Sequence, residues 1–176
     1  MIAFRIAGAN HPVFDGTGAE LHGGRWNSRG RRVIYGGESF AICMLERLVY
    51  TAIGRAPVND RFVSIAVPDD VVETVDPAHV PGWDEPGYAA ASAYGDRWFD
   101  EGRSAVLLVP SAVTAIDRNI IINQRHPDAA RLTASAEQPV RWDPRPFSSL
   151  GCSENHRSAA KRRTLCATAR NALPSN

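Results

Sequence analysis

The sequence is short of lysine, cysteine and long apolar runs, and two of these shortages exclude whole classes of protein. Among its 20 basic residues only Lys161 is lysine, a bias that we attribute to genome base composition rather than to function. The three cysteines are an odd number without CxxC spacing, which argues against a disulfide framework or a zinc site and favours a reducing cytoplasm. No apolar run approaches about 18 residues and no basic-then-apolar leader begins the chain, so we expect neither a membrane span nor secretion.

The charge balance also lacks a dominant sign. The net charge is +1 over 176 residues, which gives no general attraction to nucleic acid or membranes. With 44% hydrophobic and 22% charged residues, the composition is that of a globular protein with a real core. Residues 148–176 differ, because they carry +4 and few large aliphatic side chains, whereas residues 1–147 carry −3. We therefore expect one domain over 1–147 and a basic, flexible tail over 148–176, or alternatively a short basic helix within that tail.

Two helices are predicted from their capping residues and periodicity. Ser39 is placed to cap a helix over residues 40 to about 53, which Gly54 closes. Gly102 ends a second predicted helix over residues 88–101.

Strands and loops make up the rest of the predicted domain. The apolar run at 104–109 has strand length and is typical of a strand covered on both faces. The stretch 7–24 is rich in Gly, Pro, Asn and Asp and is predicted to be loop, and the Gly36-Gly37 pair is predicted to end a strand. Further strands are expected at 2–6, 33–35, 62–67, 71–75, 119–123 and 139–143, with a helical turn at 128–132. This mixture predicts a mixed α/β fold.

One stretch, HGGRWNSRGRRVIYGGESFAICMLERLVYTAIG at residues 22–54, combines a glycine-rich loop, a strand and a helix. In the loop, Arg25 offers a planar fork of donors suited to phosphate, and the glycines let backbone approach closely. In the helix, Glu46 shares a face with apolar side chains three and four residues away. A carboxylate on such a face is a candidate functional residue.

Each candidate also has an ordinary interpretation when it is taken alone. A helical Glu46 is commonly salt-bridged nearby, and Arg25 is commonly a surface arginine. Tyr35 fits a core aromatic residue with a bonded hydroxyl, and Ser111 after Pro110 fits a turn or helix-cap serine. Only their combination distinguishes a site from these alternatives.

The ordered motifs GGRWNSRG, VIYGGES, AICMLERL, LLVPSAV and WDPRPF resemble the RES domain, the toxin half of a bacterial toxin–antitoxin module of the RES/Xre type. The resemblance runs over residues 2–147, and Arg25, Glu46 and Ser111 occupy the Arg, Glu and Ser positions that name the family. It implies a compact single domain with a central, mostly antiparallel split sheet, similar to that of ADP-ribosyltransferase toxins. It also implies a toxin that consumes NAD as a substrate, without metal or other cofactor.

The resemblance suggests a role for each candidate residue. Glu46 would hold the ribose hydroxyls and face the positive charge that develops on the sugar when the nicotinamide–ribose bond breaks. Arg25 would bind the pyrophosphate and Tyr35 would stack on the nicotinamide ring. Ser111 would enter the same cleft. Two weaker extensions add Arg5, as a second anion ligand or a residue that lines the nicotinamide ribose, and Asn123, as an amide for the ribose or carboxamide.

The acceptor of the ADP-ribose stays open at this point. Met44 stands two residues before Glu46, where many transferases have a second carboxylate, so we favour water or phosphate over a protein acceptor. The alternative is a mono-ADP-ribosyltransferase that modifies a cellular protein.

Two further interpretations come from other functional classes. A nucleic-acid-binding module is suggested by the basic cluster Arg29 to Arg32 and the basic tail, but residues 1–147 are net acidic. An RNA-cleaving toxin would need paired acid and base residues that the sequence does not offer. As partners the resemblance implies an Xre-like antitoxin with a DNA-binding domain and self-association of the toxin, with no membrane and no direct nucleic-acid contact.

Overall fold

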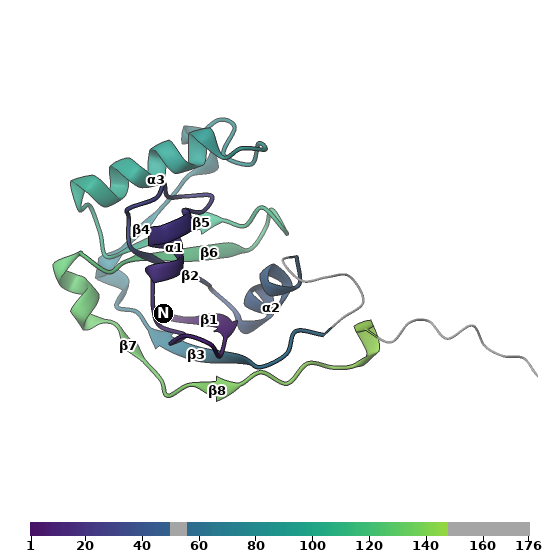
Figure 1. Cartoon of the computed structure of the whole chain (residues 1–176). Coiled ribbons are helices and arrows are strands. Elements are labelled where there is room, and N and C mark those ends of the chain that lie inside the picture. Colours follow the sequence, from purple (N-terminus) through teal and green to yellow (C-terminus); the bar gives the residue numbers. More distant parts are fainter. Residues whose placement is uncertain (50–55, 148–176) are drawn as a thin grey trace, which may run out of the picture.

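The computed structural model describes residues 1–49 and 56–147, and within them a single sheet carries three α-helices (Figure 1). The strands are β1 (Ile2–Gly8), β2 (Val33–Gly37), β3 (Asp60–Ala66), β4 (Val72–Thr74), β5 (Val106–Pro110), β6 (Arg118–Asn123), β7 (Thr133–Ala134) and β8 (Gln138–Pro139). The helices are α1 (Thr17–His22), α2 (Phe40–Val49) and α3 (Ala89–Glu101), and short 3-10 turns are Asp69–Val71, Pro77–His79, Pro127–Arg131 and Arg145–Phe147. None of the described helices is long and apolar enough to cross a membrane.

The sheet is split into two halves. In the described residues its strand order is β4-β5-β6-β2-β1-β3-β7, with β8 beside β3, and every pair is antiparallel except β4 with β5. β2 pairs with β6 over five residues and β1 with β3 over seven, whereas β1 meets β2 at one register pair, Phe4 with Gly37. This confirms the predicted mixed α/β domain with a mostly antiparallel split sheet.

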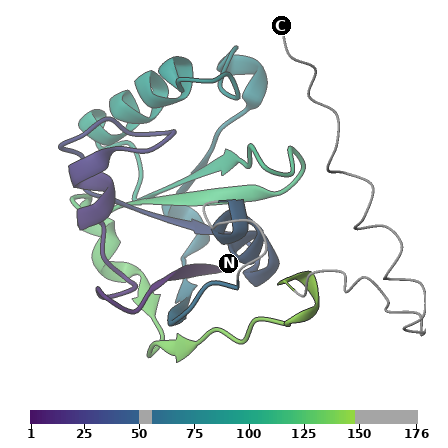
Figure 2. The same cartoon turned by 45° about the vertical axis from the view of Figure 1, so that its right-hand side comes forward.

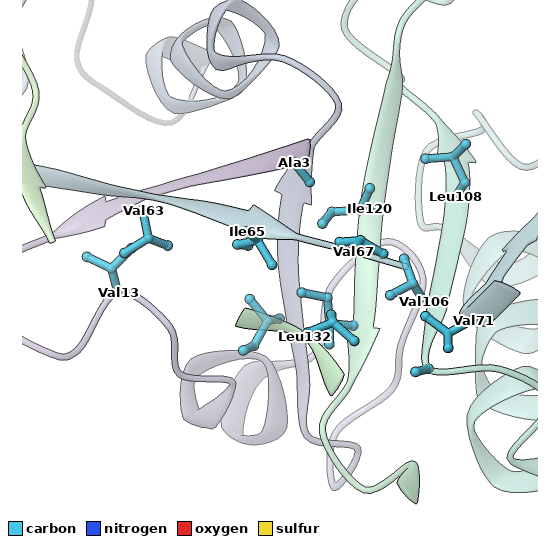
Figure 3. Packing of buried hydrophobic residues seen from close by; sticks show 13 residues of the cluster. Ala3, Val13, Val63, Ile65, Val67, Val71, Val106, Leu108, Ile120 and Leu132 are labelled. Carbon is cyan, nitrogen blue, oxygen red and sulfur yellow. The ribbon is translucent and has the colours of Figure 1, made fainter. Parts of the chain in front are cut away.

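Strand alternation places apolar side chains in two cores. Ile120 and Ile122 of β6 belong to one core and Ile121 to the other, because successive side chains point to opposite faces. In the first core the two halves of the sheet pack against each other, and Figure 3 shows Ile65 and Val67 next to Ile120 and Val106. The second core lies under α3. All five residues of β5 are buried, which confirms the prediction of a strand covered on both faces.

The two longer helices begin or end at the capping residues predicted from the sequence. α3 packs Trp98 and Phe99 into the second core and stops at Gly102, whose φ of 59° is the left-handed conformation that glycine adopts easily. α2 begins after Ser39, whose hydroxyl accepts a hydrogen bond from the Ile42 amide at 3.2 Å, so the predicted cap is confirmed. In Figures 1 and 2, α3 lies beside β4 and β5, and α2 lies across the junction of β1 and β2.

Four expectations fail and two lie outside the described residues. The stretch 7–24 is not all loop, because it contains α1, and β7 had no predicted counterpart. The strand expected at 139–143 shrinks to the two residues of β8. Gly36 and Gly37 do not follow a strand that stops at residue 35 but are the last two residues of β2, since a missing side chain does not remove the backbone donors that make a ladder. The end of the first predicted helix, at 50–54, and the tail 148–176 lie outside the described residues.

Candidate active site

A cleft of about 620 Å³ opens between α2, the loop before β2, the start of α3 and the turn after β5. Its polar and aromatic lining comprises Arg5, Arg25, Trp26, Tyr35, Glu46, Tyr88 and Asn119. A volume of this order accommodates a small organic ligand. A smaller cavity of about 240 Å³ adjoins it around Arg5, Tyr35, Glu46 and Asn119. The four residues shared by both cavities lie where the two halves of the sheet meet.

The Gly36-Gly37 pair lets α2 approach the sheet closely enough to bring Glu46 into the cleft. A Cβ on Gly37 would lie 2.4 Å from Ile42 Cγ2 and 3.0 Å from Cys43 Sγ, closer than atoms can pack. A Cβ on Gly36 would lie 2.5 Å from the Phe4 carbonyl oxygen, on the strand across the split. Both positions therefore require glycine for space rather than for an unusual φ. Cys43 fixes the same contact by donating from Sγ to the Phe4 carbonyl at 3.1 Å.

Glu46 is held through one of its two carboxylate oxygens. Ser111 donates its hydroxyl to Oε1 at 2.9 Å, and Asn119 donates from Nδ2 to the same oxygen at 2.6 Å. The Ser111 hydroxyl itself accepts hydrogen bonds from the Val113 and Thr114 amides at 3.1 and 3.4 Å. Ser111 thus serves both as the turn serine of the ordinary interpretation and as a partner of Glu46. No described residue hydrogen-bonds to Oε2, so that oxygen is available to a ligand.

Arg25 lies at the mouth of the cleft and is only partly engaged. Its guanidinium stacks 4.2 Å from the ring centre of Tyr88 and donates from Nη1 to the Trp83 carbonyl at 3.1 Å. Tyr88 precedes α3 with a φ of 62°, uncommon for a residue with a side chain. A guanidinium has five N–H donors, so Arg25 keeps several for an anionic ligand.

Tyr35 presents its ring to the cleft and uses its hydroxyl to fix the loop. The hydroxyl accepts from the Trp26 amide at 3.0 Å and donates to Asn27 Oδ1 at 2.7 Å. Asn27 is buried and donates to the carbonyls of Ala19, Ser28 and Arg31 at 3.0 to 3.2 Å. Gly24 lies directly over the Tyr35 ring, because a Cβ there would be 2.6 Å from the tyrosine hydroxyl. The core-aromatic interpretation of Tyr35 and its position in the cleft therefore both hold.

Helix α3 supports the same loop from the other side. A Cβ on Gly95 would lie within 2 Å of the Trp26 carbonyl oxygen, so the helix and loop are in direct backbone contact. Asp96 accepts from the Ser28 amide at 2.8 Å, and Arg31 pairs with Asp96 and Asp100. The arginine cluster after Arg25 thus includes a structural ion pair.

Arg5 reaches the cleft but its donors are directed at backbone. Nη1 donates to the Tyr35 carbonyl at 2.7 Å and Nη2 to the Asp15 carbonyl at 3.2 Å, and Nε donates to the Val13 carbonyl. Burial lowers the pKa of Arg5 from its ordinary value, and the nearby Asp15 opposes that shift. Arg5 therefore bridges β1, β2 and the intervening loop at the split. Three of its five N–H donors are engaged by backbone carbonyls, and its role as a second anion ligand or as part of the nicotinamide-ribose wall stays a prediction.

Asn123 is not among the residues that line the cleft, whereas Asn119 of the same strand is. Asn123 is buried at the far end of β6, where Nδ2 donates to the Phe99 carbonyl at 3.5 Å and Oδ1 accepts from the Arg125 amide at 2.9 Å. The two asparagines are four residues apart along the strand, a distance of roughly 13 Å. The antiparallel pairing of β5 with β6 could have identified Asn119, because it places the start of β6 beside the end of β5, which Ser111 directly follows.

The cleft and its surroundings contain few other ionisable or metal-binding groups among the described residues. Glu46 is the one carboxylate among the described lining residues, and Met44 stands two positions before it. Burial raises the pKa of the neighbouring Cys43 thiol to about 12, which keeps it protonated and unreactive. Within residues 1–49 and 56–147, no group of three or more His, Cys, Asp or Glu side chains could hold a metal ion. What the cleft offers is one oriented carboxylate, one partly free arginine and aromatic surface.

Known proteins share this sequence and this fold. Residues 2–143 match the family model described as the RES domain. The chain is 38% identical over 135 residues to the Prs ADP-ribosylating toxin of Sphingobium sp. (strain YBL2), covering 74% of this chain and 84% of that toxin. It is 30% identical over 151 residues to Toxin Res of Yersinia enterocolitica, covering 82% of this chain and 99% of that toxin. Toxin Res of Photorhabdus laumondii is 31% identical over 127 residues, covering 70% of this chain and 81% of that toxin.

A solved structure supports the fold independently. A chain of the crystal structure of the M. tuberculosis MbcT-MbcA toxin–antitoxin complex superposes with a TM-score of 0.64 at 20% identity, covering 83% of this chain and 86% of that one. At that identity the likeness concerns the fold alone. The match of the family model over residues 2–143, together with the identities to the toxins of Sphingobium, Yersinia and Photorhabdus, shows that the chain belongs to the RES domain family.

Proposed function

We propose that this protein is the toxin of a toxin–antitoxin module and that it consumes NAD by breaking the bond between nicotinamide and ribose. The observation that carries the proposal is the Glu46 carboxylate. Two side-chain donors hold its Oε1 inside the cleft, and Oε2 has no described partner. A fixed negative charge with one available oxygen suits a reaction that develops positive charge on a sugar.

In the proposed reaction the C1′–N bond of the nicotinamide ribose breaks and its electron pair stays with the ring nitrogen. Nicotinamide therefore leaves as a neutral molecule, and no general acid is needed. The sugar carries the positive charge, which Glu46 offsets while Oε2 bonds a ribose hydroxyl. A water oxygen then attacks C1′ and releases its proton to solvent, which gives ADP-ribose. Phosphate can take the place of water and gives the phosphorylated sugar.

The rest of the cleft offers groups that would suit the rest of the dinucleotide. Arg25 would bind the pyrophosphate with the donors that Trp83 leaves unused. The half-buried backbone at Gly23 and Gly24 lines the same wall, where close approach is possible without side chains. The Tyr35 ring, fixed by its hydroxyl, offers a face for the nicotinamide.

Water or phosphate is our first choice of acceptor, because no second carboxylate lines the described part of the cleft to activate a protein nucleophile. Transfer of ADP-ribose to a protein is the second candidate. It is favoured by the name of the relative from Sphingobium, the Prs ADP-ribosylating toxin, at 38% identity. Both candidates share bond cleavage supported by Glu46 and differ only in the nucleophile.

We also propose an antitoxin partner, because the similar fold occurs in a toxin–antitoxin complex. In keeping with the family resemblance, that partner would be an Xre-like protein with its own DNA-binding domain, and two toxins would associate within the complex. The DNA contact would then belong to the antitoxin. This assignment is consistent with the −3 charge of residues 1–147, and it makes the nucleic-acid-binding interpretation unnecessary.

The test uses purified protein and NAD labelled on its adenylate side. We expect nicotinamide release with the label in free ADP-ribose or its phosphorylated form, and the same distribution after cell lysate is added. Glu46→Gln should lower the rate by about 10² to 10³-fold, because it keeps the size of the side chain and removes its charge. The exposed Glu38, two residues before α2, supplies the control Glu38→Gln, which should retain activity. Label on one discrete protein band would instead establish the transferase, and full activity of Glu46→Gln would refute the site.

A further inference from the structure

Asn119 differs from the other two asparagines that lie inside the fold. It stands near the start of β6, opposite Gly37 of β2, and donates from Nδ2 to Glu46 Oε1 at 2.6 Å. Its Oδ1 is buried and has no hydrogen-bond partner in the described part of the chain. Asn27 and Asn123, by contrast, use both ends of their amides. An amide that stabilises a fold normally has both ends satisfied, so Asn119 needs another explanation.

The orientation of the Asn119 amide follows from its surroundings. The Ser111 hydroxyl accepts from two backbone amides, which leaves its own hydrogen for Glu46 Oε1. Turning the Asn119 amide over would aim its carbonyl oxygen at a carboxylate and create a repulsive contact. The amide is therefore held with its donor toward Glu46 while its carbonyl goes unsatisfied. This arrangement gives the Glu46 carboxylate a second hydrogen bond and leaves the Asn119 carbonyl oxygen without one.

We propose that Asn119 is a positioning residue for Glu46. With Ser111 it clamps Oε1 from the β5–β6 side of the cleft, so the carboxylate keeps one rotamer and presents Oε2 to the substrate. The two donors come from positions 65 and 73 residues beyond Glu46, so both restrain α2 relative to the second half of the sheet. The inference rests on the proposed function and adds to it a residue that acts on the substrate only through Glu46.

If Asn119 positions Glu46, its replacement should lower the activity of the protein without lowering its stability. Asn119→Leu removes the donor together with the unsatisfied carbonyl, so it should lower kcat without lowering the melting temperature. Loss of a group that orients a reacting side chain typically lowers activity by about 10 to 100-fold. Because Asn119 would not bind NAD itself, KM should stay within about twofold of wild type. Asn119→Asp, which places a second negative charge against Glu46, should reduce kcat further.

The experiment compares nicotinamide release and thermal unfolding of Asn119→Leu with those of two matched variants. Asn123→Leu removes an asparagine on the same strand whose amide is satisfied at both ends, and its melting temperature should fall. Arg118→Gln changes the exposed neighbour of Asn119 and should leave both measurements unchanged. A wild-type kcat for Asn119→Leu, or a melting temperature that falls as far as that of Asn123→Leu, would overturn the inference.

A growth assay keeps this inference distinct from the proposed function. If wild-type protein releases no nicotinamide yet arrests growth when it is expressed, NAD is the wrong substrate. Asn119→Leu should still relieve the arrest as Glu46→Gln does, because the clamp acts on the carboxylate whatever the substrate is. If Glu46→Gln relieves the arrest and Asn119→Leu does not, the clamp is wrong and the site stands.

Discussion

Replacing Gly37 with alanine should move α2 away from the sheet and disconnect Glu46 from its partners. The added Cβ would lie 2.4 Å from Ile42 Cγ2, whereas ordinary carbon contacts begin near 3.4 Å. Relief of that overlap requires a displacement of roughly 1 Å, and Cys43 Sγ at 3.0 Å blocks a sideways adjustment.

The consequence at the site can be worked out from the hydrogen bond between Asn119 and Glu46. A shift of that size would lengthen the 2.6 Å distance from Nδ2 to Oε1 beyond about 3.2 Å, the normal limit of such a bond. Misplacement of a catalytic group by about 1 Å lowers rates by on the order of 100-fold. Overpacking of this kind also destabilises a fold by about 1–3 kcal/mol. We therefore expect a large loss of kcat with a modest loss of stability.

The assay is nicotinamide release at saturating NAD, measured beside chemical denaturation of the same protein. Gly8→Ala is the matched control, because a Cβ there meets nothing closer than an ordinary contact at 3.8 Å with Arg47 Nη2. Adding Ile42→Ala to Gly37→Ala removes the clashing methyl group and should restore part of kcat. If Gly37→Ala alone keeps both kcat and stability, close packing of α2 does not position Glu46.

Two other measurements probe the anion site and the buried thiol. Arg25→Ala should raise KM for NAD more than it lowers kcat, since the lost contact is with the pyrophosphate and not with the reacting carbon; an unchanged KM would place the pyrophosphate elsewhere. In a Cys152→Ser/Cys166→Ser background, a thiol reagent at pH 8 should label Cys43 only after denaturant is added, because burial raises the pKa of the Cys43 thiol to about 12. Rapid labelling of Cys43 in the native protein would contradict its burial. The raised pKa also implies that the folded state loses stability as pH rises above the ordinary thiol pKa, because the Cys43 thiol ionises first in the unfolded chain.

Local sequence signals were sufficient for much of the fold. Ser39 and Gly102 mark helix ends through contacts with their own neighbours, and the apolar run before Pro110 reads as a buried strand from its composition. The sequence failed where a segment had a weak local signal, as at α1, which has no buried residue, and at β8, which is two residues long. Such short elements are held by the surfaces they lie against rather than by propensity.

By itself the sequence determined the family, the main helices and strands, and the candidates Arg25, Tyr35, Glu46 and Ser111, all of which line the cleft or contact a residue that does. Only the tertiary structure decided that Asn119 and not Asn123 meets Glu46, and that Arg5 bridges the split in the sheet. The physical reason is the separation along the chain of the residues that interact. Caps and periodicity act within a few residues, whereas the clamp on Glu46 joins positions 65 and 73 residues apart and depends on strand order, register and the space left by two glycines.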